Sequence, residues 1–157
     1  MGLFRKTFSR KGIDPVNSPS TDPVVDFIDA LGQHDVERAM SVISDNVRVT
    51  VYGGPRGNSA AVLRDVLDDL VRAFPDLLVT TKRILRTGGV VTAELKIEGT
   101  QAADYAGAIN QEKHLDLDEA WRFEVAGGQI TAVDAYWCQQ QLYRRLGVKR
   151  FDQIAIV

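Results

Sequence analysis

Two strand-like runs joined by a pair of glycines, residues 115–125 and 130–137, constrain the fold of this chain more than any other feature. Successive side chains of a strand point to opposite faces of a sheet. One face of the first run is therefore apolar except for a single carboxylate, Glu119, whereas the other face is charged or small. The apolar members of the first face are Leu117, Trp121, Phe123 and Val125. Glycine pairs such as Gly127-Gly128 are typical of hairpin turns. The pattern predicts a hairpin in a sheet that curves around an apolar cavity.

The rest of the chain places helices early and strands late. Apolar residues recur at helical spacing in residues 22–32, 36–43 and 59–73, and a further helix or turn is expected at residues 139–146. Alternating patterns predict strands at residues 47–52, 77–85 and 91–97. This order predicts an α+β fold in which the helices pack on one face of a curved antiparallel sheet.

The composition limits the classes of function. A chain of 157 residues with 45% hydrophobic residues fits one globular domain. Its net charge of −2 argues against a nucleic-acid partner. The single cysteine, Cys138, excludes an intramolecular disulfide and a cysteine-based metal cluster, and no other spacing of ligand residues indicates a metal. No apolar run approaches the ~20 residues of a membrane helix. We expect a cytoplasmic protein without stable membrane insertion.

The first 21 residues differ from the remainder. They carry Arg5, Lys6, Arg10 and Lys11 before the first acid and then become rich in glycine, proline and serine. This composition predicts a flexible basic tail, residues 1–21, in front of a single domain, residues 22–157. The tail is either solvated or in contact with an acidic surface.

Several short motifs resemble those of a known family. They are Ala73-Phe74-Pro75-Asp76-Leu77, Glu98-Gly99-Thr100, Glu119-Ala120-Trp121-Arg122-Phe123, Gly128-Gln129-Ile130, and the ending from Tyr136-Trp137-Cys138-Gln139 to Arg144-Arg145-Leu146-Gly147. Together with the order of elements, they resemble the SnoaL-like polyketide cyclases of the nuclear transport factor 2-like superfamily. The resemblance implies a cone-shaped, highly curved antiparallel or mixed sheet, with about three N-terminal helices around an apolar pocket. It also implies a homodimer paired through the outer face of the sheet.

The family's catalytic residues are mostly missing at the matching positions. Ala135 stands where the resemblance implies a cyclase aspartate, and Trp121 stands where it implies a histidine. Phe27 and Val51 replace the tyrosine and aspartate of the isomerase pattern. Leu95 and Ile97 stand where the epoxide hydrolase pattern has an arginine and an aspartate, and Ala135 stands where it has a second aspartate. Glu119 alone matches an acidic position, where isomerases hold a protonated aspartate that donates to a developing enolate.

Glu119 is the candidate catalytic residue. An ionised carboxylate in an apolar pocket is costly, so burial raises its pKa and favours the neutral acid. A neutral acid can donate a proton or hydrogen bond to a carbonyl. The alternatives are a structural pair with Arg56 or His114, or a place in water at the rim of the pocket. The residues expected to line the ligand pocket are Phe27, Val51, Leu95, Tyr105, Trp121, Phe123, Ala135 and Trp137.

Two hypotheses for function follow. The first is a cofactor-independent enzyme that acts on a hydrophobic carbonyl compound of polyketide or isoprenoid type by cyclisation, isomerisation or dehydration. The second is a non-catalytic module of the same fold that binds a ligand or a protein. Asp134 also lies on the last long strand, but its parity places it on the outer face, which favours a surface or interface role.

Overall fold

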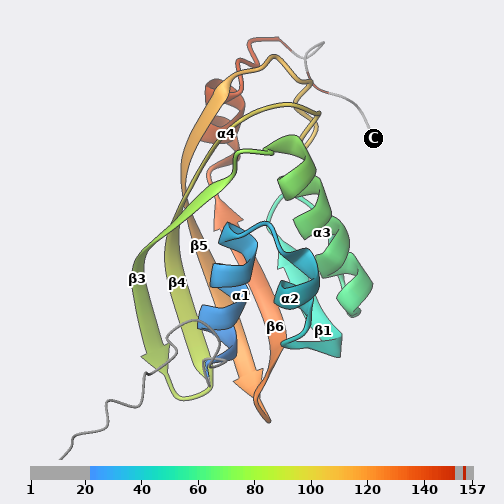
Figure 1. Ribbon diagram of the computed structural model, residues 1–157. Coiled ribbons are helices and arrows are strands. Elements are labelled where there is room, and N and C mark those ends of the chain that lie inside the picture. The colour runs from blue at the N-terminus through green and yellow to red at the C-terminus, as the bar shows by residue number, and fades with distance from the viewer. Residues whose placement is uncertain (1–21, 151–153, 155–157) are drawn as a thin grey trace, which may run out of the picture.

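The computed structural model describes residues 22–150 and Ile154, so the predicted basic tail lies outside the described residues. Four helices and six strands follow one another along the chain (Figure 1). In chain order they are α1 (Pro23–Gly32), α2 (Val36–Met40), β1 (Ile43–Val51), β2 (Arg56–Gly57), α3 (Ala60–Ala73), β3 (Leu78–Thr87), β4 (Val90–Thr100), β5 (His114–Ala126), β6 (Gln129–Trp137) and α4 (Gln139–Arg145). No helix in the described part of the chain is long and apolar enough to cross a membrane.

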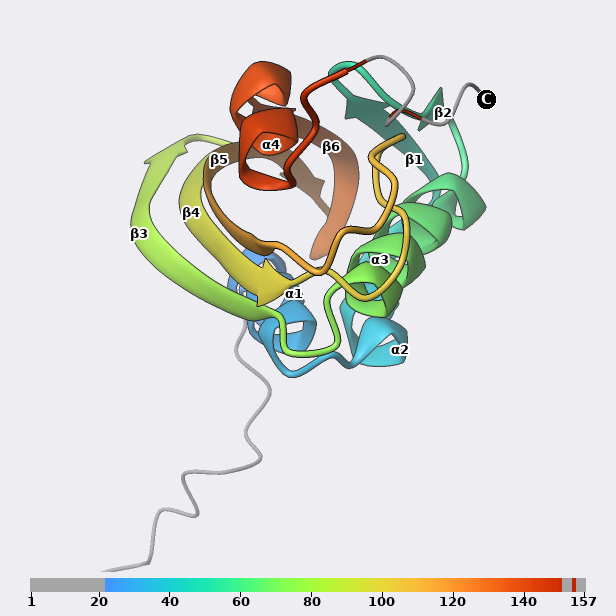
Figure 2. The same ribbon diagram turned by 90° about the horizontal axis from the view of Figure 1, so that it is seen from above.

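The strands form one mixed sheet in the order β2-β1-β6-β5-β4-β3. Neighbouring strands run antiparallel except β1 and β6, which run parallel. The sheet bends around the space that α1 and α3 close, and α4 lies across one end (Figure 2). The α+β class and the curved mixed sheet are therefore confirmed.

The predicted hairpin is formed by β5 and β6. Gly127 and Gly128 both adopt positive φ, at 60° and 76°, which is the reason for glycine at this turn. Cross-strand neighbours extend the apolar face over the sheet, because Glu119 lies between Leu95 of β4 and Trp137 of β6. In the next row, Trp121 lies between Ala93 and Ala135. The inner face is thus apolar around a single acid, as the alternation predicts.

The second helix and the first strand differ from the sequence prediction. Asp35 caps α2 by accepting a hydrogen bond from the Arg38 amide at 3.0 Å, but the helix ends at Met40 and does not reach residue 43. Ile43 instead begins β1 and pairs with Ile130 of β6. A pairing between segments so far apart in sequence overrides the local helical pattern.

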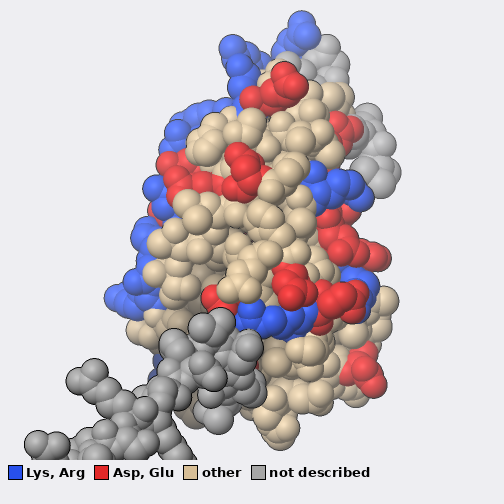
Figure 3. All heavy atoms as spheres, in the orientation of Figure 1, with Lys and Arg blue, Asp and Glu red and all other residues tan. Residues whose placement is uncertain are grey.

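Charged side chains of both signs are interspersed over the face that carries α1, α2 and α3 (Figure 3). The opposite, outer face of the sheet holds a buried carboxylate, Asp134, which is only 3% exposed. Arg48 donates to one of its oxygens at 2.9 Å, and Arg122 donates to the other at 3.2 Å. Asp134 therefore joins three strands on the outer face, where its parity places it.

We expect Asp134→Ala to lower the free energy of unfolding by about 1–3 kcal/mol, because charge-assisted hydrogen bonds from two arginines are lost. Urea unfolding followed by circular dichroism measures this change. Asp118→Ala is the matched control, since Asp118 makes one exposed ion pair with Lys82 at 3.1 Å and its loss should change stability by less than about 1 kcal/mol. Equal effects of the two substitutions would contradict the structural role of Asp134.

Candidate functional site

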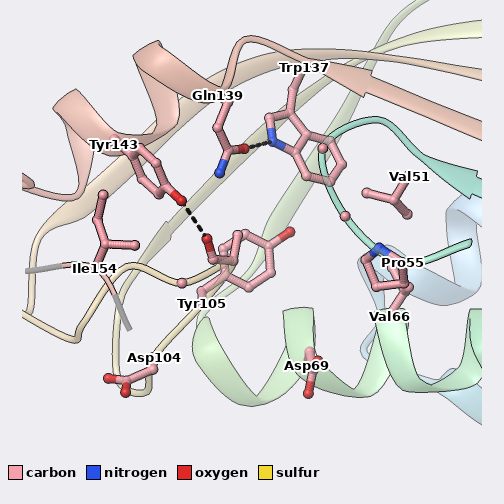
Figure 4. Close-up of a pocket in the computed structure, with 14 residues that line it drawn as sticks. Val51, Pro55, Val66, Asp69, Asp104, Tyr105, Trp137, Gln139, Tyr143 and Ile154 are labelled. Carbon is pink, nitrogen blue, oxygen red and sulfur yellow. Dashed lines mark hydrogen bonds between the residues drawn. The ribbon is translucent and has the colours of Figure 1, made fainter. Parts of the chain in front are cut away.

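A cavity of about 560 Å³ opens at the end of the sheet near α4. Its walls come from five parts of the chain: the end of β1 with the loop that follows it, α3, residues 104–107, the end of β6 with α4, and Ile154 (Figure 4). Val51, Pro55 and Val66 form its apolar side. The cavity therefore collects side chains from segments that are distant in sequence.

Three of the expected pocket residues line this cavity, and five do not. Val51, Tyr105 and Trp137 are in its wall. The other five are buried in the core and lie outside the cavity lining: Phe27, Leu95, Trp121, Phe123 and Ala135. Strand alternation places the four of these residues that belong to the sheet on its inner face, but the packing of α1, which carries Phe27, decides whether that face is hollow or filled.

An aromatic cluster fills the deep part of the inner face. Phe27 of α1 packs against Phe123 with ring centres 5.5 Å apart and against Trp121 with ring centres 6.1 Å apart. Trp121 and Phe123 stack on the same strand at 6.3 Å. Aromatic rings at such distances contribute packing energy beyond the area they bury. The family pocket expected from the resemblance is therefore closed at this depth, and the cavity lies nearer the sheet end.

Glu119 is buried next to Trp137, its cross-strand neighbour in the cavity lining, and it borders a separate shallow groove of the surface. The residue is 6% exposed, and one carboxylate oxygen accepts a hydrogen bond from the Trp121 indole N–H at 2.9 Å. Burial raises the pKa of Glu119 to about 7, and the Trp121 hydrogen bond opposes this rise. Both protonation states are thus populated near neutral pH.

Neither predicted structural partner contacts Glu119. Arg56 lies over the Tyr52 ring, 5.7 Å from its centre, and exposed His114 lies 3.5 Å from the Thr100 hydroxyl. The predicted ion pair of Glu119 with Arg56 or His114 is therefore wrong, and most of the Glu119 surface is buried. In the described chain, every fully enclosed side-chain oxygen or nitrogen has a hydrogen-bond partner, so the second oxygen of Glu119 retains accessible surface.

Tyr105 lies in the cavity wall, within range of the charge of Glu119. Its ring packs edge-on against Phe74 at 5.2 Å, and its hydroxyl points into the cavity (Figure 4). Burial raises the pKa of the Tyr105 hydroxyl, and the negative charges of Glu119 and Asp69 raise it further. The hydroxyl makes no hydrogen bond within the described residues and is a neutral donor available to a ligand.

Two further polar residues at the cavity were missed by the sequence reasoning. The Trp137 indole N–H donates to the Gln139 side-chain oxygen at 2.9 Å, which directs the Gln139 amide nitrogen toward the cavity (Figure 4). The Tyr143 hydroxyl donates to the Ala106 carbonyl at 3.0 Å and ties α4 to residues 104–107. The only sequence signal was their position directly after the last strand.

Comparison with known proteins places this architecture in a family. The model of the SnoaL-like domain matches residues 24–133, which include α2, α3, nearly all of α1, the strands β1 to β5, the first part of β6, and Glu119. The chain belongs to the SnoaL-like domain family. No curated protein sequence matches it.

Solved structures similar to this SnoaL-like domain include three named relatives. A candidate SnoaL-like polyketide cyclase from Jannaschia sp. CCS1 is 14% identical, with a TM-score of 0.73 over 82% of this chain and 91% of that chain. IdmH, a candidate polyketide cyclase from Streptomyces antibioticus, is 19% identical, with a TM-score of 0.68 over 80% of this chain and 96% of that chain. An LEH-like epoxide hydrolase from M. tuberculosis is 18% identical, with a TM-score of 0.63 over 79% of this chain and 86% of that chain. At these identities the likeness concerns the fold.

Within this SnoaL-like domain, the described residues bring together no group of three or more His, Cys, Asp or Glu side chains suited to a metal ion. The titratable groups at the cavity are carboxylates and tyrosines. The arrangement suits proton transfer and hydrogen bonding to a ligand oxygen.

Proposed function

We propose that this SnoaL-like protein is a cofactor-independent enzyme that moves a proton next to the carbonyl of a small hydrophobic compound of polyketide or isoprenoid type. The supporting observation is Glu119, a buried acid with a pKa of about 7 that lies next to Trp137 of the cavity lining and is held by the Trp121 indole. An acid with such a pKa gives and takes a proton near neutral pH.

The proposed step is a balanced proton exchange. The Glu119 carboxylate accepts a proton from the carbon beside the carbonyl. The electron pair of that C–H bond forms the C=C bond of an enolate, and the π pair of the carbonyl moves to its oxygen. Tyr105 donates a hydrogen bond to this oxygen and stabilises the enolate. Return of the proton to a different carbon of a conjugated enolate completes isomerisation. In cyclisation the enolate carbon attacks a second carbonyl, the first C=O bond re-forms, and the alkoxide formed at the second carbonyl takes the proton from Glu119.

A second candidate function is a ligand-binding module without chemistry. The observation that favours it is the aromatic cluster, because Phe27, Trp121 and Phe123 fill the region where the family pocket was expected. Glu119 is also outside the cavity lining. The homodimer and the cytoplasmic location stay predictions.

Hydrogen–deuterium exchange tests the proposal. The protein is incubated in D₂O with 2-tetralone and with larger polycyclic ketones, and exchange at the carbon beside the carbonyl is followed by NMR. We expect exchange above the buffer rate, reduced about a hundredfold in Glu119→Gln. Glu124→Gln is the matched control, because Glu124 lies on the same strand with its ion pair to Arg122 on the outer face.

Two results would contradict the proposal in different ways. Exchange that is undiminished in Glu119→Gln would remove Glu119 from the reaction. Ketones that bind without any exchange above buffer would favour the binding module.

A further inference from the structure

The side-chain amide of Gln139 offers the cavity a hydrogen-bond donor of fixed direction. An indole N–H can only donate, so the Trp137 indole holds the amide oxygen of Gln139 at 2.9 Å and the amide nitrogen must face away from it. That nitrogen points toward the cavity (Figure 4). It makes no hydrogen bond to any residue that the structure describes. The donor is therefore oriented by the protein and available to a ligand.

A second donor reaches the cavity from another wall. Tyr105 belongs to the loop between β4 and β5, and within residues 22–150 and Ile154 its hydroxyl has no hydrogen-bond partner. In Figure 4 the amide nitrogen of Gln139 lies on the side of Tyr143, whereas the Tyr105 hydroxyl points to the side of Val51. Because the two donors face different parts of the cavity, a ligand that meets both needs two acceptor atoms.

The other polar side chains of the lining are engaged or turned away. The Tyr143 hydroxyl donates its hydrogen to a backbone carbonyl at 3.0 Å. Asp69 is paired with an arginine at 2.6 Å, and Asp104 accepts from a backbone amide at 2.8 Å. Both carboxylates are turned away from the Tyr105 and Trp137 rings (Figure 4). No lysine, arginine or histidine belongs to the described lining, so the polar groups that face a ligand are neutral donors.

We propose that Gln139 selects the ligand of this cavity by donating a hydrogen bond to a second acceptor oxygen, so that the cavity takes a neutral compound with two carbonyl oxygens. Trp137 is the positioning residue, because its indole N–H holds the amide with the nitrogen toward the ligand. Tyr105 donates to the carbonyl at which the enolate forms, and Gln139 donates to the other. The inference deepens the proposed function and rests on it for the ligand cavity, but its test needs binding alone.

Matched neutral probes test the number of acceptors. meta-Diacetylbenzene and para-diacetylbenzene carry two carbonyl groups at different spacings. Their isosteres, meta- and para-isopropenylacetophenone, replace one carbonyl oxygen by a methylene group of similar shape. Titrations are followed by the NMR signals of the Gln139 side-chain amide, which Gln139→Met assigns by their loss. We expect at least one diacetylbenzene to shift these signals downfield and its isostere to leave them in place.

The ratio of the affinities for the dicarbonyl and for its isostere isolates the Gln139 contact. In Gln139→Met this ratio should fall about three- to tenfold, because one neutral hydrogen bond is lost. Trp137→Phe should lower the ratio about twofold, because the released amide can present its oxygen or its nitrogen. Gln140→Met is the matched control and should keep the ratio, since Gln140 is the exposed neighbour on α4 outside the cavity lining.

Two results would overturn the inference: an unchanged ratio in Gln139→Met, and amide signals that neither diacetylbenzene shifts. The proposed reaction is judged separately by the exchange assay. A ratio that depends on Gln139, without exchange of ketone hydrogens, would support the inference and contradict proton transfer. Exchange that depends on Glu119, with an unchanged ratio, would support the reaction and overturn the inference.

Discussion

Phe123→Ala is expected to lower the free energy of unfolding by about 3–5 kcal/mol, the range typical of a large aromatic removed from a packed core. Phe123 has no exposed surface and packs against Phe27 from α1 and against Trp121 on its own strand. The substitution leaves a cavity between helix and sheet that these neighbours cannot fill. Urea unfolding at several temperatures measures the loss.

The size of this loss distinguishes a core residue from a pocket wall. Leu85→Ala is the control, because Leu85 is 48% exposed on the edge strand β3 and its loss should change stability by about 0.5 kcal/mol or less. A loss below about 1 kcal/mol for Phe123→Ala would mean that the side chain faces open space, as the resemblance implied.

The stability of the protein is expected to fall as the pH rises from 4.5 to 7, and Glu119→Gln should remove this fall. Burial raises the pKa of Glu119 from its ordinary value of 4.5 to about 7 in the folded protein. Between these values the unfolded chain releases the proton and the folded chain keeps it, so deprotonation favours unfolding. The difference in pKa corresponds to about 3 kcal/mol of stability, fully lost above pH 7.

The measurement compares urea unfolding of the two proteins from pH 4 to pH 8. Relative to the native protein, Glu119→Gln should gain about 3 kcal/mol over this range, because glutamine stays neutral and its side-chain oxygen still accepts from the Trp121 indole. The stability of Glu124→Gln, a change on the outer face of the same strand, should vary with pH as that of the native protein does. Parallel curves for the native protein and Glu119→Gln would mean that the carboxyl titrates normally.

The part of the fold that follows from side-chain alternation could be predicted from the sequence. The two-residue period of residues 115–125 fixes which side chains share a face, so Glu119 among apolar neighbours was predictable. The start of β1 could not be predicted in this way. Ile43 belongs to the sheet because it pairs with Ile130, and no local sequence pattern indicates that long-range pairing.

The residues that line the cavity were harder to predict from the sequence. Alternation shows that Trp121 and Trp137 share a face, but it does not show that Phe27 packs onto the first and leaves the second at the cavity. Tyr105, Asp69 and Gln139 converge from a loop and two helices whose relative placement depends on the whole fold. No periodic pattern in the sequence indicates that these residues come together.

The parallel pairing of β1 with β6 sets a condition on synthesis. Arg48 and Asp134, which join these strands, are 86 residues apart in the chain. During synthesis on the ribosome, β1 is made long before β6, and the two-residue strand β2 is the one strand partner of β1 that is made earlier. The antiparallel strands β3 to β6 pair with sequential neighbours and are complete before the sheet can take in β1. The backbone edge of β1 that pairs with β6 therefore has no strand partner until β6 has been made.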